Sequence, residues 1–153
     1  MLRFDKYHGG VNTDYMRAEL QQLKSPDSIV EELRFDCITV NAEKIKLIVE
    51  AIPTATKLKK VVLNKCKLRT EYHIQLYNAI KTNDTIGELK LIHVHLLPKA
   101  TTSLSELLIS NHNITRLMVR DCGIDDREME DLSKGIKSHK LEHLDLRNNI
   151  FED

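Results

Sequence analysis

Apolar residues recur along this chain with a period of 28 residues, and this repeat is the strongest constraint on the fold. Five segments carry an apolar residue, or in one case asparagine, at the same five places. The sets are Val30, Leu33, Phe35, Ile38 and Val40; Leu58, Val61, Leu63, Cys66 and Leu68; Ile86, Leu89, Leu91, Val94 and Leu96; Ile114, Leu117, Val119, Cys122 and Ile124; and, 27 residues later, Leu141, Leu144, Leu146, Asn149 and Phe151. Five copies in register indicate a chain built from stacked, similar units.

The segments between these copies have helical spacing. Three further columns of residues repeat with the same period: Leu20, Ile48, Leu76, Leu104 and Leu132; then Leu23, Ala51, Ala79, Leu107 and Gly135; then Ile52, Ile80, Leu108 and Ile136. Within a unit they fall at i, i+3 and i+4, which is one face of a helix. Thr70 and Pro98 are typical helix starts. Each unit is therefore predicted as a short strand followed by a helix.

Each copy reads L-x-x-L-x-L-x-x-C/N-x-L and resembles the ribonuclease-inhibitor-like class of leucine-rich repeats. The resemblance implies an α/β solenoid, a segment of a right-handed α/β horseshoe with a parallel concave sheet and helices on the convex face. It implies a single domain over residues 1–153, with a capping unit at 1–29 and repeats starting near 30, 58, 86, 114 and 141. Proteins of this class bind other proteins on the concave sheet or its rim, and their partners differ.

Both ends depart from the pattern. Met16, Leu20 and Leu23 keep helical spacing, but Lys24 replaces the apolar residue of the third column, which suits a capping unit. A degenerate strand is expected before them, around Leu2, Phe4 and Tyr7.

At the other end, residues 141–151 supply a strand with no helix after it. We expect Leu144, Leu146 and Phe151 to leave a partly uncovered core and an open sheet edge. A longer natural chain, simple exposure and a contact there are the alternatives. A contact is slightly favoured, and it includes self-association through this uncapped edge.

Composition excludes several functional classes. Lys and Arg number 23 and Asp and Glu also 23, so no bulk charge favours nucleic acid or an anionic membrane. No apolar run approaches the length of a membrane span. Three cysteines without Cys-x-x-Cys spacing and a start without an apolar signal region favour a cytoplasmic, reducing compartment. The glycosylation sequon that begins at Asn83 is a short motif that often arises by chance.

The third, fifth, seventh and eighth positions of each repeat are predicted on the concave face, because side chains alternate along a strand. Ten of these residues form the candidate partner-binding surface: Arg34, Lys60, Val62, Lys90, Ile92, Arg116, Met118, Arg120, Asp145 and Arg147. Val62, Ile92 and Met118 form an apolar centre ringed by charge, which is the anatomy of a protein-binding patch. The alternative is a solvated sheet face with three scattered apolar residues.

Cysteines and histidines fit structural roles better than chemistry. Cys66 and Cys122 hold the ninth repeat position and are expected in the core, roughly 10 Å apart and too far for a disulfide. Cys37 falls one place earlier, at a surface position, as an inert thiol. His93 and His95 share a strand face, and His112 is the only plausible third ligand, so a zinc site is not favoured.

The runs at 57–60 and 65–67 are the only local basic concentrations. They could meet phosphate, but core residues interrupt them and aromatic residues are absent from them, which favours a solvated edge. No Gly-rich phosphate loop, nucleophile elbow or paired catalytic carboxylate is evident, and no cofactor or metal is expected.

The sequence therefore predicts a non-enzymatic protein-interaction module or scaffold whose partner is another protein. Two alternatives come from the class resemblance: a regulator of a partner enzyme, similar to GTPase-activating factors, and a capping or assembly protein of the cytoskeleton.

Overall fold

A computed structural model describes residues 1–7 and 12–152 of the chain. Within them strands alternate with helices. In chain order the elements are β1 (Leu2–Asp5), α1 (Thr13–Leu20), η1 (Gln21–Lys24), β2 (Glu32–Asp36), α2 (Ala42–Ala51), η2 (Ile52–Thr54), β3 (Lys60–Asn64), α3 (Thr70–Lys81), β4 (Glu88–Ile92), α4 (Pro98–Ser110), β5 (Arg116–Arg120), α5 (Asp126–Lys137) and β6 (His143–Asp145).

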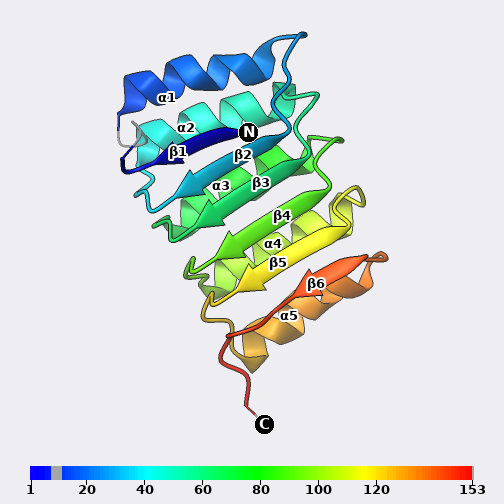
Figure 1. The fold of residues 1–153 in the computed structure, drawn as a ribbon. Helices are drawn as coiled ribbons and strands as arrows, with labels where there is room; N and C mark the ends of the chain where they lie inside the picture. The colour runs from blue at the N-terminus through cyan, green and yellow to red at the C-terminus, as the bar shows by residue number, and fades with distance from the viewer. Residues whose placement is uncertain (8–11, 153) are drawn as a thin grey trace.

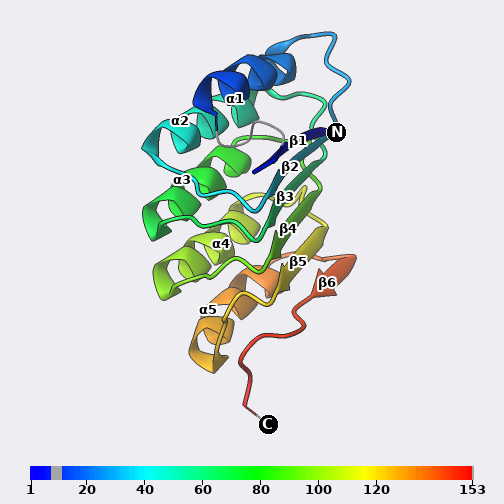
Figure 2. The ribbon, with the colours of Figure 1, turned by 60° about the vertical axis from the view of Figure 1, so that its left-hand side comes forward.

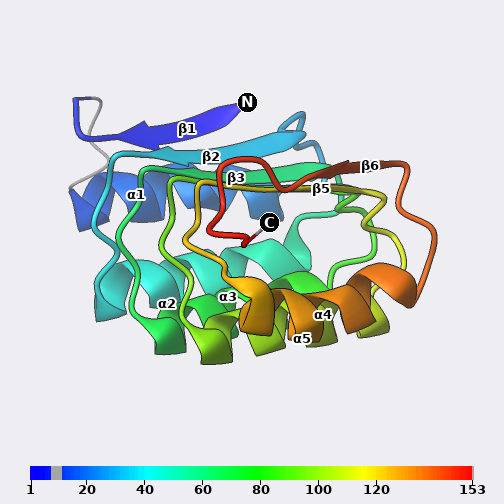
Figure 3. The same ribbon diagram turned by 90° about the horizontal axis from the view of Figure 1, so that it is seen from below.

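The strands form one parallel sheet in sequence order, β1 to β6. Leu33 pairs with Val61, which pairs with Leu89, so neighbouring strands are offset by one repeat. All five helices pack in a single layer on one face of the sheet (Figures 1, 2 and 3). The opposite face, which we call the concave face, carries no helix among the described residues. The predicted α/β leucine-rich repeat solenoid is confirmed.

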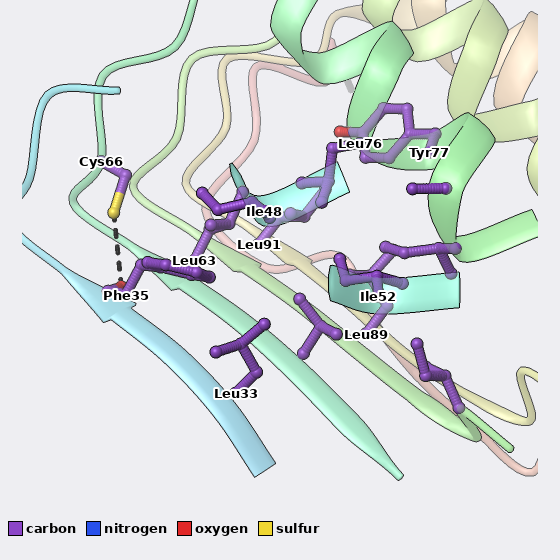
Figure 4. Close-up of a cluster of buried hydrophobic side chains, with 14 of the residues drawn as sticks. Leu33, Phe35, Ile48, Ile52, Leu63, Cys66, Leu76, Tyr77, Leu89 and Leu91 are labelled. Carbon is purple, nitrogen blue, oxygen red and sulfur yellow. Dashed lines mark hydrogen bonds between the residues drawn. The ribbon is translucent and has the colours of Figure 1, made fainter. Parts of the chain in front are cut away.

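The core lies between the sheet and the helices, where the fourth and sixth positions of each strand meet the helix columns (Figure 4). These strand residues are at most 1% exposed in the middle repeats: Leu33, Phe35, Val61, Leu63, Leu89, Leu91, Leu117 and Val119. The corresponding region at the C-terminal edge is less covered. Leu144 is 40% exposed and Phe151 is 42% exposed, as expected for a strand without a helix after it.

A residue with left-handed backbone conformation follows each of the strands β2 to β5, at the eighth repeat position, and the turn after β6 repeats it. These residues are Cys37, Lys65, His93, Asp121 and Asn148, with φ between 50° and 61°. At this turn the chain leaves the sheet and runs toward the helix layer. It also exposes Cys37, as predicted.

At the N-terminal strand and the helix starts the structure departs from the sequence prediction at two residues, Tyr7 and Thr70. β1 pairs with β2, and Met16, Leu20 and Leu23 are buried, whereas Tyr7 lies outside the strand and is exposed. Pro98 opens α4 as predicted. Thr70 is the first helical residue of α3 rather than its cap, because Arg69 occupies the N-cap position.

Cys66 and Cys122 are buried thiols without a disulfide, as predicted. The Cys66 thiol donates to the carbonyl of Phe35 at 3.3 Å (Figure 4). The Cys122 thiol donates to the carbonyl of Leu91 at 3.4 Å. Burial raises the pKa of both thiols to about 11, so neither is a nucleophile near neutral pH. Each thiol ties one strand to the preceding one.

His73 and Tyr77 form a buried polar pair on α3. Nδ1 of His73 lies 3.2 Å from the Tyr77 hydroxyl, and Nε2 of His73 is buried without a hydrogen-bond partner among the described residues. Burial lowers the pKa of His73 from 6.5 to about 4. As the pH falls below 6.5, His73 is therefore protonated in the unfolded chain, whereas in the folded chain it stays neutral until the pH nears 4.

Because the pKa of His73 is lowered in the folded state, we expect the protein to lose stability in mild acid. Between pH 7 and pH 5 the free energy of unfolding should fall by about 2 kcal/mol through His73 alone. The double variant His73→Leu/Tyr77→Phe replaces both partners by apolar groups and should lose this part of the pH dependence. Urea denaturation at several pH values measures it. Tyr77→Phe alone should keep the slope, and an unchanged slope in the double variant would refute the assignment.

Candidate partner-binding surface on the concave face

The concave face is a grid of side chains, because alternate residues of every strand point away from the helices. One row across the sheet joins Glu32, Lys60, Glu88, Arg116 and His143. The next row joins Arg3, Arg34, Val62, Lys90, Met118 and Asp145. The third joins Asp5, Asp36, Asn64, Ile92 and Arg120. The structure therefore places nine of the ten predicted surface residues on this grid, with Arg147 just beyond β6.

Asp36 neutralises the N-terminal part of this face. It is buried and accepts hydrogen bonds from Nε of Arg34 at 2.7 Å and from Nδ2 of Asn64 at 2.8 Å. Nε of Arg3 lies 2.9 Å from the same carboxylate. Burial opposes ionisation of Asp36, but the hydrogen bonds from Arg34 and Asn64 outweigh it and lower its pKa. Arg34 is therefore held within the molecule and offers little to a partner.

Val62 is not available to a partner, which corrects the sequence prediction. Its side chain is 0% exposed although it lies outside the main hydrophobic core. In the register its neighbours are Arg34 on β2 and Lys90 on β4. We infer that the aliphatic stems of these two neighbours cover Val62, because long basic side chains bury their stems along apolar surface. The predicted apolar centre is thus reduced to Ile92 and Met118.

The middle lysines are paired with carboxylates. Nζ of Lys60 lies 3.4 Å from Glu32, and Nζ of Lys90 lies 3.1 Å from Glu88. All four side chains are only about one-quarter exposed or less. These pairs leave the centre of the face close to electrical neutrality.

The arginines of β5 are different. Arg116 is 51% exposed, and its Nε approaches Glu88 only to 3.9 Å, while Glu88 already pairs with Lys90. Arg120 is half-buried and makes no ion pair with any described residue. Met118 lies between them along the strand, and Ile92 is the register partner of Arg120. Two incompletely neutralised guanidinium groups therefore flank two half-buried apolar side chains.

Asp145 and Arg147 form an ion pair at the C-terminal edge of the sheet. The guanidinium of Arg147 donates two hydrogen bonds to the Asp145 carboxylate, at 2.9 and 2.8 Å. These bonds lower the pKa of Asp145 to about 2. Asp145 is buried whereas Arg147 is largely exposed, so only the arginine of this predicted pair presents itself to a partner.

The repeat positions already placed Glu32 and Glu88 on this face, but the sequence prediction did not pair them with its basic residues. Glu32 and Glu88 occupy the same repeat position as Lys60 and Arg116, and this alternation of charge every 28 residues was visible in the sequence. In a parallel sheet such residues lie side by side, so the alternation predicts pairing across strands.

His93, His95 and His112 do not form the three-ligand group that a zinc site would require. His93 forms an ion pair with Asp121, whereas His112 stacks on His139 with ring centroids 5.0 Å apart. Across residues 1–7 and 12–152, no group of three or more potential ligands is close enough to hold a metal ion. None of the helices described in these ranges combines the length and the apolar character required to cross a bilayer.

Comparisons with known proteins agree with the fold. A scan of family models finds no match. The chain is 32% identical over 112 residues to "NACHT, LRR and PYD domains-containing protein 14" of Mus musculus; this covers 71% of the chain but 11% of that protein, so the chain spans about a tenth of its relative. Among solved structures, "Leiomodin-1 Actin-Binding Site 2 (ABS2)" is similar with a TM-score of 0.65 and 19% identity, covering 88% of this chain and 77% of that one.

Proposed function

We propose that this chain is a non-enzymatic leucine-rich repeat module of the ribonuclease-inhibitor-like class that binds another protein through the β4–β5 part of its concave face. The observation that supports this most is the state of Arg116 and Arg120. Elsewhere on the face the basic side chains lie within 3.4 Å of a carboxylate of the same molecule. Those of β5 lack such a pair.

The chemistry of the partner follows from this arrangement. A guanidinium that is already paired gains little from a second carboxylate, whereas Arg116 and Arg120 keep donors for one. Ile92 and Met118 between them provide apolar area for a buried anchor. The expected partner surface is acidic around an apolar side chain. This complementarity would mainly set specificity and the rate of association.

The comparisons support the class of molecule rather than the partner. The name of the mouse relative includes LRR, which agrees with the leucine-rich repeat pattern of this chain. The leiomodin structure is only 19% identical to this chain, so its similarity supports the fold and not actin binding.

Four statements remain predictions of the sequence: the cytoplasmic location, the single domain over 1–153, the capping role of residues 1–29 and the repeat starts. Actin co-sedimentation and a GTP-hydrolysis panel test the two alternative functions, and light scattering at several concentrations tests self-association.

A double substitution tests the apolar centre of the surface. Ile92→Ala/Met118→Ala should weaken partner binding at least tenfold, because a few buried side chains in the middle of an interface supply most of its binding free energy. Ile109→Ala is the matched control, since Ile109 is an exposed aliphatic residue on α4 in the helix layer. Quantitative pull-down with each immobilised variant measures the effect. Equal loss in the two variants, or none in either, would contradict the proposed surface.

A further inference from the structure

A basic cleft lies at the rim of the solenoid, beyond the ends of β3 and β4. It has a volume of about 430 Å³ and is open to solvent. Its walls are two neighbouring loops, 65–69 between β3 and α3 and 93–97 between β4 and α4, which run side by side at the arrowhead end of the sheet (Figures 1 and 3). The residues with ionisable nitrogen in its lining are Lys65, Lys67, Arg69, His93 and His95.

The charges in this cleft are not neutralised by the protein. Lys65, Lys67 and Arg69 are exposed and form no ion pair with any described residue. No carboxylate lines the cleft, although Asp121 pairs with His93 and Glu71 follows Thr70 in the first turn of α3. Three full positive charges and two imidazoles therefore converge on a small volume, in a chain whose net charge is zero.

The sequence obscured this cluster because it showed the basic residues of the region as one concentration. The structure separates them. Lys57, Lys59 and Lys60 lie before or at the start of β3, and Lys59 and Lys60 pair with Glu31 and Glu32. Lys65 and Lys67 lie beyond the other end of the same strand, where the next repeat brings the histidines beside them.

We propose that this cleft binds a phosphate monoester, as carried by a phosphorylated side chain or a small phosphorylated molecule. A compact dianion suits cations that converge on one point. The fork of Arg69 and the ammonium groups of the two lysines are the donors that phosphate recognition uses. Thr70, the first residue of α3, lines the cleft, and the first turn of a helix favours anions through its backbone N–H groups. Leu97, half-exposed at the margin, offers apolar contact to the group that carries the phosphate.

Extended polyanions fit this site less well. Nucleic acid requires basic residues distributed along a groove and aromatic side chains for base stacking, and the cleft is lined by neither phenylalanine nor tyrosine. A membrane surface requires a broad basic face, whereas Arg34, Lys60 and Lys90 on the neighbouring concave face pair with carboxylates of the chain.

The experiment is a titration of the ¹⁵N-labelled chain with O-phospho-L-serine at constant ionic strength, followed by amide chemical shifts. We expect saturable shifts confined to residues 65–70 and 93–97, and weaker shifts at the same amides with inorganic phosphate. L-serine should give none. Lys67→Ala/Arg69→Ala should weaken the affinity at least tenfold. Lys57→Ala, an exposed lysine before the same strand, should leave it unchanged.

Several outcomes would overturn the site. One is a titration without saturation. Another is an equal response in Lys57→Ala and Lys67→Ala/Arg69→Ala, which would reduce the effect to general charge screening. If decauridine RNA or phosphatidylserine vesicles bind more tightly than the monoester through the same side chains, the ligand of the cleft is a polyanion and the proposal is wrong. None of these outcomes depends on the protein-binding role of β5, since Arg116 and Arg120 do not line the cleft.

Discussion

Replacing Asn83 by alanine is expected to lower the free energy of unfolding by about 4 kcal/mol, a large effect for a single side chain. Asn83 is 4% exposed and lies in the turn that returns the chain from α3 to β4. Its Nδ2 donates to the carbonyls of Ile52 and Ala55, at 2.8 and 3.1 Å. Its Oδ1 accepts from the amides of Thr85 and Ile86, at 2.9 and 3.1 Å. Alanine leaves the amides of Thr85 and Ile86 without their hydrogen-bond acceptor, at about 1–3 kcal/mol each, and removes one of the donors to the carbonyls of Ile52 and Ala55. Urea denaturation measures the loss.

Two further variants sharpen this prediction. Asn83→Asp keeps the acceptor but turns an ionised carboxylate toward the carbonyls of Ile52 and Ala55, so it should also destabilise strongly. Asn113→Ala removes an exposed amide from the equivalent turn of the next repeat and should change stability by less than about 0.5 kcal/mol. If Asn83→Ala costs no more than Asn113→Ala, the hydrogen bonds of the turn are not what joins the repeats.

The role of Asn83 shows what the apolar pattern could not predict. Asn111, 28 residues later, repeats the arrangement, and its Nδ2 donates to the carbonyls of Ile80 and Asn83. The sequence showed Asn83 only as the first residue of a glycosylation sequon. The 28-residue interval between the two asparagines was visible. The sequence could not show that these two side chains are buried and bonded to the backbone, because the same residue type also occurs exposed, as at Asn113.

The fold itself was predictable because its signal is repeated. A single Leu-x-Leu pattern cannot be told from chance, but four consecutive strands with the same spacing fix a parallel register, and the register follows that spacing from Leu33 to Leu117. Helix spacing between the strands fixed which face they bury. The repeat pattern continues past β6, because Asn149 holds the ninth repeat position, the place of Cys66 and Cys122 in earlier units. There Asn149 holds the chain by accepting from the amide of Cys122 and donating to the carbonyl of Val119.

The binding surface was predictable in position but not in accessibility. Strand alternation places Val62, Ile92 and Met118 on one face, and the structure agrees. Whether such a residue can be reached depends on the rotamers of its long neighbours. Arg34 and Lys90 flank Val62 and leave it covered, whereas Ile92 has Asn64 on one side and stays half-exposed. Arg34 and Lys90 are held in place by ion pairs within their own strands, with Asp36 and Glu88, which a count of charges does not reveal.

Reversing the two arginines of β5 is expected to remove partner binding while leaving the fold intact. Arg116→Glu/Arg120→Glu changes the charge of the surface by four units and sets like charges against an acidic partner, so the affinity should fall at least a hundredfold. Stability should change by less than about 1 kcal/mol, because neither arginine makes a close ion pair with a described residue. Thermal unfolding followed by circular dichroism, beside quantitative pull-down, measures both quantities.

Reversing a different pair of cations provides the matched control. Lys57 and Lys140 are exposed, lie outside the strands and form no ion pair with described residues. Lys57→Glu/Lys140→Glu therefore makes the same change in net charge without touching the proposed surface. A partner lost equally in both double variants would reflect the net charge of the molecule rather than this face.

The most direct test of the concave-face account is affinity capture from a lysate of the source cells, quantified by mass spectrometry. Wild type, Arg116→Glu/Arg120→Glu and the Lys57/Lys140 control are compared at equal fractions folded. The account predicts a protein retained by wild type and by the control but depleted at least tenfold from Arg116→Glu/Arg120→Glu. The same proteins in equal amounts on all three would contradict it and assign binding to the helices, the rim or the edge at β6.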